Sequence, residues 1–412
     1  MKKLIMILLS VLLCACSSVQ DKPVINMNSP VPKQFAVKKT SEIRQSEKYE
    51  AKNYDTVRAV WISYLELAPI MNSGEEHFRS EFENICKNCS EIGFNTVFVH
   101  VRAFSDAFYP SEFYPFSKAF SGNTFDALKI MTETAHSCDL SFHAWINPLR
   151  CETKEEILKM PADCQVNKWL ADPKKYDEYV VYVESTKHYW LNPAVPEVRK
   201  LIADGAAEIV RNYNVDGIHI DDYFYPTEQP FFDSGIYVEQ NITKPLSEWR
   251  MDNCSDMVSM MYSAVKKENG SVLFGIAPQG NIENNYSYMF ADVKRWMTEE
   301  GFCDYIAPQI YFGYLNKYKP FAETLDVWCG LPRSSKVRLM VGIAAYKIAS
   351  EDEFINREGI IADQIALSMS KTDGAILFSY RSLFGTERAD TERECVSKEF
   401  LQERNKNNSK IT

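Results

Sequence analysis

Short β-rich runs alternate with amphipathic helical stretches from residue 57 to residue 404, and this alternation constrains the fold more than any other feature. The expected strands cover residues 57–63, 95–102, 140–147, 216–221, 271–278, 303–310, 337–343 and 374–380. The expected helices cover residues 76–92, 124–138, 197–213, 251–268, 287–299, 318–328, 351–370 and 387–404. Strands separated by helices form βαβ units with a parallel sheet. Eight such units predict an α/β protein of the (β/α)8 or TIM barrel class, with an open doubly wound sheet as the alternative.

Alternation within the strands predicts which side chains face the barrel interior. In the run 95–102, one face is aliphatic and the other carries Phe98, His100 and Arg102. Successive strand residues point to opposite faces, so the aliphatic face suits packing against helices. The other face becomes polar toward the end of each strand, where the active sites of such barrels lie.

Polar and aromatic side chains are therefore expected to gather at this rim. Carboxylates and amides bind sugar hydroxyls, and aromatic faces stack on sugar rings. The expected set is Trp61, His100, Arg102, Asp106, Trp145, Asn147, Arg150, His219, Asp221, Asp222, Tyr223, Gln279, Gln309, Tyr311 and Tyr380.

The strongest local signal is the segment 216–226, with the sequence DGIHIDDYFYP. Asp221 is expected to end the strand on the inner face, with His219 one layer below, and Asp222 begins the following loop. Glycosidic cleavage needs a carboxyl group that donates a proton and one that stabilises positive charge at the anomeric carbon. Repulsion between neighbouring carboxylates can keep one of them protonated. Turn capping and cation binding are the alternative roles of this pair.

Several other residues allow two interpretations. His100 and His143 fit hydrogen-bonded interior histidines or ligands, and His219 fits either role equally. Arg102 could pair with Asp106 or orient the catalytic carboxylate. Tyr311 could bind an acetamido group, or it could simply pack in the core.

The N-terminus predicts a lipoprotein signal peptide. A short basic start precedes an apolar run from Leu4 to Leu13, which is too short to span a bilayer. Ala15 precedes Cys16 as in a bacterial lipobox, so Cys16 is the expected lipidation site; an ordinary secreted protein is the alternative. Residues 17–53 are polar and contain three prolines, Pro23, Pro30 and Pro32, which predicts a flexible tether.

Charge and cysteine usage exclude other classes of function. The net charge of −10 argues against a nucleic-acid partner, which would require a basic patch. No Gly-x-Gly-x-x-Gly follows the first strand, so dinucleotide binding has no support. Cys86 and Cys89 lie in a helical pattern, which favours packed thiols over a metal or redox site. Neither a cofactor nor a metal is expected.

Several segments resemble the glycosyl hydrolase-like 10 family of bacterial lipoproteins. The resemblance covers roughly residues 54–385 and is most specific in two segments, 143–150 (HAWINPLR) and 216–226. Weaker matches are RAVW at 58–61, VR at 101–102, SDAFY at 105–109, WLNP at 190–193, PQIY at 308–311 and FSY at 378–380.

This resemblance implies a barrel, a lipid anchor and hydrolysis of peptidoglycan glycan strands stripped of peptides, between N-acetylmuramic acid and N-acetylglucosamine. The strand ending at Asp221 is also similar to that of the amylase-like clan, in which the matching Asp is a nucleophile. Two departures stand out: His219 replaces the Arg of that clan, and Ala277-Pro278-Gln279 offers no Glu. Asp222 is therefore the expected acid. Adjacent acidic pairs also occur in hexosaminidases whose substrate acetamido group attacks, and the residues fit either mechanism.

These features together predict an extracytoplasmic glycoside hydrolase that acts on N-acetylhexosamine cell-wall glycan. Asp221 and Asp222 would be catalytic, and the remaining rim residues except His100 would bind the sugar. The expected organisation is a signal peptide (1–15), a lipidated Cys16 with linker (16–53), the barrel (54–405) and a C-terminal tail (406–412). We expect a monomer that faces outside the cytoplasm and contacts the membrane through its anchor only. The alternatives are a non-catalytic glycan-binding lipoprotein and a two-lobed solute-binding lipoprotein.

Overall fold

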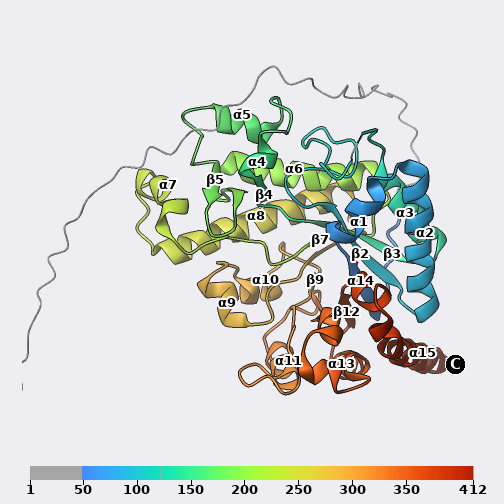
Figure 1. The fold of residues 1–412 in the computed structure, drawn as a ribbon. Helices are drawn as coiled ribbons and strands as arrows, with labels where there is room; N and C mark the ends of the chain where they lie inside the picture. Colours follow the sequence, from blue (N-terminus) through green and yellow to red (C-terminus); the bar gives the residue numbers. More distant parts are fainter. Residues whose placement is uncertain (1–48, 121, 412) are drawn as a thin grey trace, which may run out of the picture.

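The computed structural model describes residues 49–120 and 122–411, and its central feature is a ring of parallel strands surrounded by helices (Figure 1). The nine strands of the main sheet follow the order β10-β9-β8-β7-β3-β2-β1-β12-β11. They are β1 (Val57–Ile62), β2 (Thr96–Arg102), β3 (Ser141–Ile146), β7 (Gly217–Ile220), β8 (Leu273–Ile276), β9 (Tyr305–Ile306), β10 (Arg338–Leu339), β11 (Val341–Ile343) and β12 (Gly374–Phe378).

The eight-stranded prediction is confirmed, because β10 and β11 are two parts of the single expected strand 337–343. Only Met340 separates them, and its backbone N–H still bonds to the carbonyl of Ile306 at 2.9 Å. β10 pairs with β9, whereas β11 pairs with β12, so this one segment joins the two ends of the sheet. The ring is therefore a (β/α)8 barrel rather than an open sheet.

The helices agree with the expected segments except where one segment divides. Of the expected helix 287–299, only residues 293–298 are helical apart from the last residue of a short helix that ends at Ser287. The segment 351–370 divides into two helices, and the helix expected at 387–404 continues to Ile411. The helices are α1 (Tyr64–Met71), α2 (Glu75–Ile92), α3 (Ala127–Ser137), α4 (Lys154–Ile157), α5 (Gln165–Ala171), α6 (Pro196–Asn212), α7 (Ser234–Glu239), α8 (Leu246–Glu268), α9 (Ile282–Ser287), α10 (Val293–Thr298), α11 (Phe321–Cys329), α12 (Asp352–Ile355), α13 (Ile360–Met369), α14 (Tyr380–Phe384) and α15 (Asp390–Ile411).

Two insertions extend the barrel at the C-terminal ends of its strands. The first follows β3 and forms a small antiparallel sheet in the order β4-β6-β5, with strands β4 (Arg150–Thr153), β5 (Val180–Val183) and β6 (His188–Leu191). In Figure 1, α4 and α5 of this insertion lie toward the top of the view, and β4 and β5 lie below them. The second, residues 221–245, follows β7 and contains α7. The aromatic-rich stretches 147–195 and 222–250, which lie between expected elements, are expected to wall the cleft, and the antiparallel sheet in the first of them was not predicted.

A hydrogen-bonded chain runs through the barrel interior. The indole N–H of Trp61 donates to Nε2 of His219 at 3.1 Å. The hydroxyl of Tyr305 lies 3.0 Å from Nδ1 of His219 and 3.0 Å from Nδ1 of His143. Nε2 of His143 lies 3.0 Å from Oδ1 of Asn53. Because Trp61 can only donate and the Asn53 oxygen can only accept, both histidines fit the neutral state, and burial lowers the pKa of each.

Residues 49–53, which fall within the expected linker, contact the base of the barrel around Asp216. This fully buried carboxylate accepts hydrogen bonds from the Tyr49 hydroxyl at 2.5 Å and the backbone N–H of Lys52 at 2.6 Å. His136 at 2.8 Å and the backbone N–H of Phe142 at 2.7 Å complete its partners. Asp216 therefore joins the entering chain to the beginning of β7.

The ionised carboxylate of Asp216 predicts that the folded protein loses stability in acid. Burial alone would raise the pKa of this carboxyl, but hydrogen bonds from His136, Tyr49 and Phe142 lower it below its usual value. A carboxyl whose pKa is lower in the folded state stabilises the fold above its unfolded pKa of about 3.9 and loses this effect as pH falls through the folded pKa. We expect Asp216→Asn to cost about 1–3 kcal/mol at pH 7 and less below pH 4. The urea midpoints of the wild-type protein and the Asp216→Asn variant, measured from pH 7 to pH 3, test this. A difference between the two midpoints that stays constant in acid would contradict the prediction.

Within the described residues, no helix is both long and apolar enough to cross a membrane. The predicted signal peptide, Cys16 and most of the linker lie outside the described residues.

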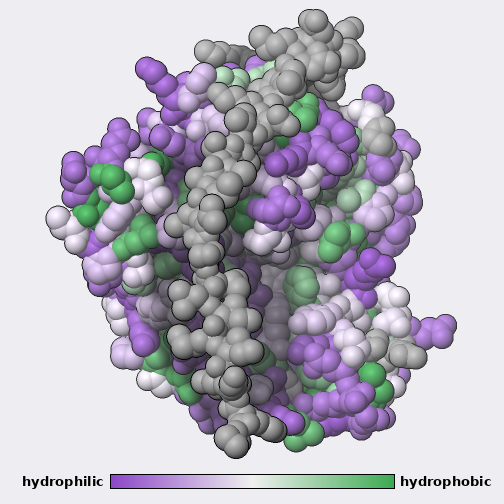
Figure 2. Space-filling view, turned by 60° about the vertical axis from the view of Figure 1, so that its left-hand side comes forward, coloured by the Kyte–Doolittle hydropathy of each residue, from purple (hydrophilic) through white to green (hydrophobic). Residues whose placement is uncertain are grey.

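Cys86 and Cys89 are free and buried on α2, and burial raises the pKa of both thiols. The face shown in Figure 2 is mostly hydrophilic, with hydrophobic residues in small separate groups.

Candidate active site

The candidate active site lies where β7 ends, because Asp221 and Asp222 follow this strand directly. β7 pairs with β3 on one side and with β8 on the other. The residues that follow those strands, Asn147 and Gln279, therefore flank the acidic pair. Asp221 is buried, whereas Asp222 is partly exposed. Asp222 is therefore the more exposed residue of the pair.

Amide side chains hold both carboxyls. Nδ2 of Asn147 donates to Oδ1 of Asp221 at 2.6 Å. Nε2 of Gln309 donates to Oδ1 of Asp222 at 3.2 Å and to the carbonyl of Ala277 at 2.9 Å. Gln279 also favours the ionised form of Asp222 and so lowers its pKa. The position after β8, where the amylase-like clan keeps a carboxylate, thus supplies an amide near one.

Burial and mutual repulsion make this pair an acid near neutral pH. Burial and the charge of Asp222 raise the pKa of Asp221 to about 8, against the opposing effects of Arg150 and Asn147. Burial also raises the pKa of Asp222, opposed by its amide partners. Two interacting carboxyls titrate as one unit, so the pair retains one shared proton near pH 7. Such a pair can donate a proton while its other member carries negative charge.

Aromatic rings around Arg150 form one wall of the mouth. Its guanidinium lies 4.1 Å from the ring centre of Tyr223 and 4.3 Å from that of Phe104. Tyr223 stacks on Trp190 of β6, with ring centres 6.1 Å apart. Arg150 and Trp190 both belong to the antiparallel insertion, so this insertion supplies one side of the site.

The opposite wall contains Tyr311. Its ring lies 6.0 Å from that of Phe378 at the end of β12 and 5.8 Å from that of Tyr346. Burial and the negative charges of the acidic pair raise the pKa of Tyr311 well above its usual value. The hydroxyl therefore remains protonated and can donate a hydrogen bond near the two carboxyls.

Three predicted residues form the floor beneath the acidic pair. Trp61 and His219 belong to the interior hydrogen-bonded chain and are buried. Trp145 is also buried, and its indole N–H has no hydrogen-bond partner among the described residues. These side chains give the floor its shape, and Trp145 retains a free donor.

The structure places Arg102 outside the barrel wall, which corrects the placement expected from strict alternation. His100 pairs with Trp145 of β3, but Arg102 pairs with the next residue, Ile146, so β2 contains a bulge. A bulge inserts one residue and reverses the side on which later side chains lie. The Arg102 guanidinium stacks on Tyr114 at 4.2 Å, away from the acidic pair.

Asp106 stabilises the turn after β2, since its Oδ1 accepts hydrogen bonds from the backbone N–H groups of Ala103 at 3.1 Å and Phe104 at 2.9 Å.

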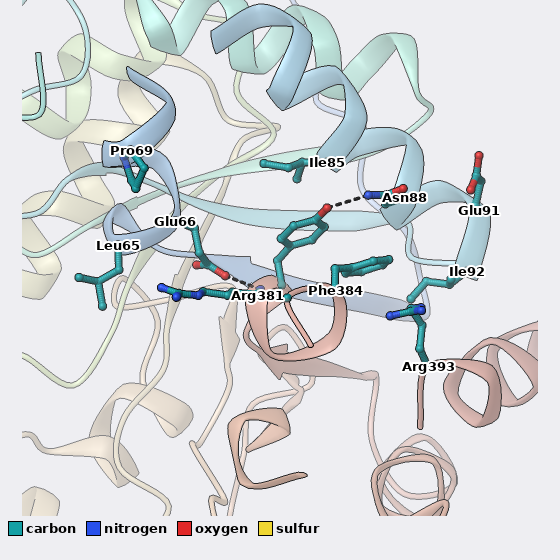
Figure 3. A pocket seen from close by; sticks show the side chains of 12 residues that line it. Leu65, Glu66, Pro69, Ile85, Asn88, Glu91, Ile92, Arg381, Phe384 and Arg393 are labelled. Atoms are coloured by element: carbon teal, nitrogen blue, oxygen red, sulfur yellow. Dashed lines mark hydrogen bonds between the residues drawn. The ribbon is translucent and has the colours of Figure 1, made fainter. Parts of the chain in front are cut away.

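Tyr380 also lies apart from the acidic pair. Helix α14 begins at Tyr380, so the alternation of side chains along β12 no longer applies there. The tyrosine hydroxyl accepts a hydrogen bond from Asn88 of α2 at 2.8 Å (Figure 3). The structure thus places neither Asp106 nor Tyr380 beside the two carboxyls.

Three aromatic residues of the mouth were absent from the expected set. Tyr64 and Phe104 lie within 5.5 and 4.3 Å of the Arg150 guanidinium, and Tyr346 contacts Tyr311. Each follows the end of a barrel strand by two or three residues. That position alone could have identified them, because the loops after barrel strands form the mouth.

The fold and the site define a (β/α)8 barrel with two adjacent carboxyls, held by amide side chains, at the C-terminal end of β7. Residues 56–357 match the glycosyl hydrolase-like 10 family, and the chain belongs to this family. It is 31% identical over 322 residues to glycosyl hydrolase YngK of Bacillus subtilis (strain 168), covering 71% of this chain and 61% of YngK. It is 26% identical over 424 residues to glycosyl hydrolase DigH of Escherichia coli (strain K12), covering 91% of each.

Solved structures support the fold at low sequence identity. The glycoside hydrolase domain of PgaB (BpsB) from Bordetella bronchiseptica aligns with a TM-score of 0.57 and 11% identity, covering 83% of this chain and 99% of that domain. The catalytic domain of β-amylase from Paenibacillus polymyxa aligns with a TM-score of 0.56 and 13% identity, covering 85% of this chain and 99% of that domain.

Proposed function

We propose that this protein is a glycoside hydrolase that cleaves cell-wall glycan built of N-acetylhexosamines, namely peptidoglycan strands lacking peptides. One observation carries the proposal: two adjacent carboxyls, both with a raised pKa, lie at the mouth of a barrel whose family is glycosyl hydrolase-like. The relatives named glycosyl hydrolases and the aromatic walls around Arg150 and Tyr311 support it.

In this proposal, the partly exposed Asp222 faces the glycosidic oxygen and transfers a proton to it as the bond from that oxygen to the anomeric carbon breaks. Water then supplies the hydroxyl of the new reducing end, and its remaining proton returns to the carboxyl pair. Asp221 lies beneath and, once ionised, stabilises positive charge at the anomeric carbon. Asn147 supports that charge by donating to Oδ1 of Asp221 at 2.6 Å. The neutral Tyr311 hydroxyl is placed to bond an acetamido or hydroxyl oxygen of the sugar.

The direct test uses glycan strands from which the peptides have been removed. The purified protein should release new reducing ends, and mass spectrometry in heavy-oxygen water should show label in the product. Binding without product would favour the alternative of a non-catalytic glycan-binding protein. Hydrolysis of only an unrelated neutral glycan would overturn the substrate assignment.

The shared proton predicts the alkaline limit of activity. Because the pKa of Asp221 is raised to about 8, the pair should lose its last proton as pH rises through that value. We expect kcat/KM to fall above about pH 8, since general acid catalysis requires the protonated form. A pH–rate profile from pH 4 to pH 10 tests this, and constant activity up to pH 10 would contradict it.

We also propose that Cys16 carries a lipid and anchors the protein to a membrane, facing outside the cytoplasm. The apolar run from Leu4 to Leu13 and the Leu13-Cys14-Ala15-Cys16 sequence support this proposal. Labelled palmitate should enter the full chain but not a Cys16→Ser variant, and the variant should leave the membrane fraction. Equal labelling of both would overturn it.

A further inference from the structure

His100 has a fixed ring plane next to the candidate site. It lies on the inner face of β2 and is almost completely buried. Its ring stacks on Trp145, with ring centres 3.3 Å apart and an angle of 19° between the planes. The ring of Tyr64 meets it edge-on, with centres 5.5 Å apart. The two ring nitrogens are therefore the only groups through which His100 can form directional contacts.

The contacts of these nitrogens determine the tautomer of His100. Nδ1 lies 3.2 Å from the backbone nitrogen of Tyr64, which can only donate, so Nδ1 accepts. Nε2 then carries the hydrogen in the neutral ring and lies 2.9 Å from Oδ1 of Asn147. Burial and the nearby Arg150 lower the pKa of His100, so the ring remains neutral at neutral pH.

Asn147 receives a second hydrogen bond that fixes the same orientation. Nη2 of Arg150 donates to Oδ1 of Asn147 at 2.9 Å. With two donors directed at its oxygen, the carboxamide must present its NH2 group on the other side. There it donates to Oδ1 of Asp221 at 2.6 Å. A reversed amide would place its NH2 against two donors and its oxygen against a carboxylate, which is unfavourable at every contact.

We infer that His100 is a positioning residue for Asp221, acting through the carboxamide of Asn147. The inference rests on the proposed function for its kinetic consequence but not for its geometry. His100 and Arg150 hold the amide in the orientation that stabilises the ionised carboxyl. Without His100, only Arg150 still donates to the Asn147 oxygen. The amide is then held less firmly against Asp221, and Asp221 retains its proton to higher pH because its hydrogen bond from Asn147 is weaker.

The kinetic test compares two substitutions of His100. His100→Phe keeps a ring that can stack on Trp145 but removes both nitrogens, whereas His100→Gln can still donate to Asn147. We expect kcat to fall on the order of 10–100-fold in His100→Phe, with KM changed less than about twofold. The alkaline limb of the pH–rate profile should move to higher pH, and His100→Gln should restore part of the rate.

A double-substitution cycle separates positioning from a general structural effect. If His100 acts through Asn147, then His100→Phe should have no further effect on kcat in an Asn147→Ala background. His143→Phe is the matched control, because His143 is another buried, neutral interior histidine and contacts Tyr305 and Asn53 instead. It should leave the pH–rate profile unchanged. Additive effects, or equal profile shifts in both histidine variants, would overturn the inference.

Two spectroscopic measurements remain valid even if no glycan is cleaved. Nitrogen-15 spectra of histidine-labelled protein should show His100 neutral with its hydrogen on Nε2 from pH 5 to pH 8. The carboxyl carbon of Asp221 should titrate at higher pH in His100→Phe than in the wild-type protein. The inference would be overturned by a hydrogen on Nδ1 of His100, by a charged His100 ring, or by an Asp221 titration that His100→Phe leaves unchanged. If the wild-type protein is inactive but shows the expected His100 and Asp221 spectra, only the proposed function is contradicted.

Discussion

Asp222→Asn should reduce the rate of glycan hydrolysis by about 10²–10⁴-fold, because an amide has no acidic proton to transfer to the leaving oxygen. The fold should remain intact. Asp221→Asn should cause a loss in the same range, since the charge that stabilises the anomeric centre disappears. The measurement is the rate of reducing-end release at saturating glycan. Glycan binding should persist in both variants, because each substitution preserves the size of the side chain.

Thermal unfolding distinguishes this result from a damaged fold. Asp221 is buried and is repelled by the neighbouring charge of Asp222, so replacing either carboxyl should leave the melting temperature unchanged or raise it. Glu283→Gln is a suitable control, because Glu283 is an exposed carboxylate on α9 whose partner is Lys319. It should retain full activity. Wild-type rates in both aspartate variants would remove the acidic pair from the mechanism.

Arg250→Met should lower the free energy of unfolding by about 3–5 kcal/mol, the expected effect of removing one partner of a buried ion pair. Arg250 and Asp233 are both buried, and Nε of Arg250 lies 2.9 Å from Oδ2 and 3.0 Å from Oδ1 of the carboxylate. The guanidinium also donates to the carbonyls of Glu228 at 2.8 Å and Gln229 at 2.9 Å. These contacts join the 221–245 insertion to α8, so the substitution leaves several buried groups unpaired.

Urea unfolding of three variants tests this prediction. The double variant Arg250→Met/Asp233→Leu should be more stable than Arg250→Met alone, because no unpaired buried charge remains. Lys336→Met is the control: Lys336 forms an exposed ion pair with Glu300, and its loss should leave the midpoint unchanged. An Arg250→Met midpoint equal to that of the wild type would show that the insertion is held by other contacts.

The barrel could be predicted because its signals are local. The expected strand 95–102 agrees with β2 at 96–102, and the expected helix 76–92 agrees with α2 at 75–92. Each element shows a hydrophobic period of its own, independent of its partners. The proximity of Asp221 to Asn147 also follows from a local rule, because the ends of adjacent parallel strands meet at one rim.

The sequence by itself determined the strand–helix alternation, the inward face of most strands and the position of the acidic pair at the end of β7. Only the tertiary structure decided the direction of Arg102, which depends on a bulge against β3, and of Tyr380, which depends on where α14 begins. It also decided the tautomer of His100, because that requires Tyr64 and Asn147 from two other strand ends at hydrogen-bond distance. Register, bulges and hydrogen-bond direction arise from contacts between distant segments, and no local periodicity encodes them.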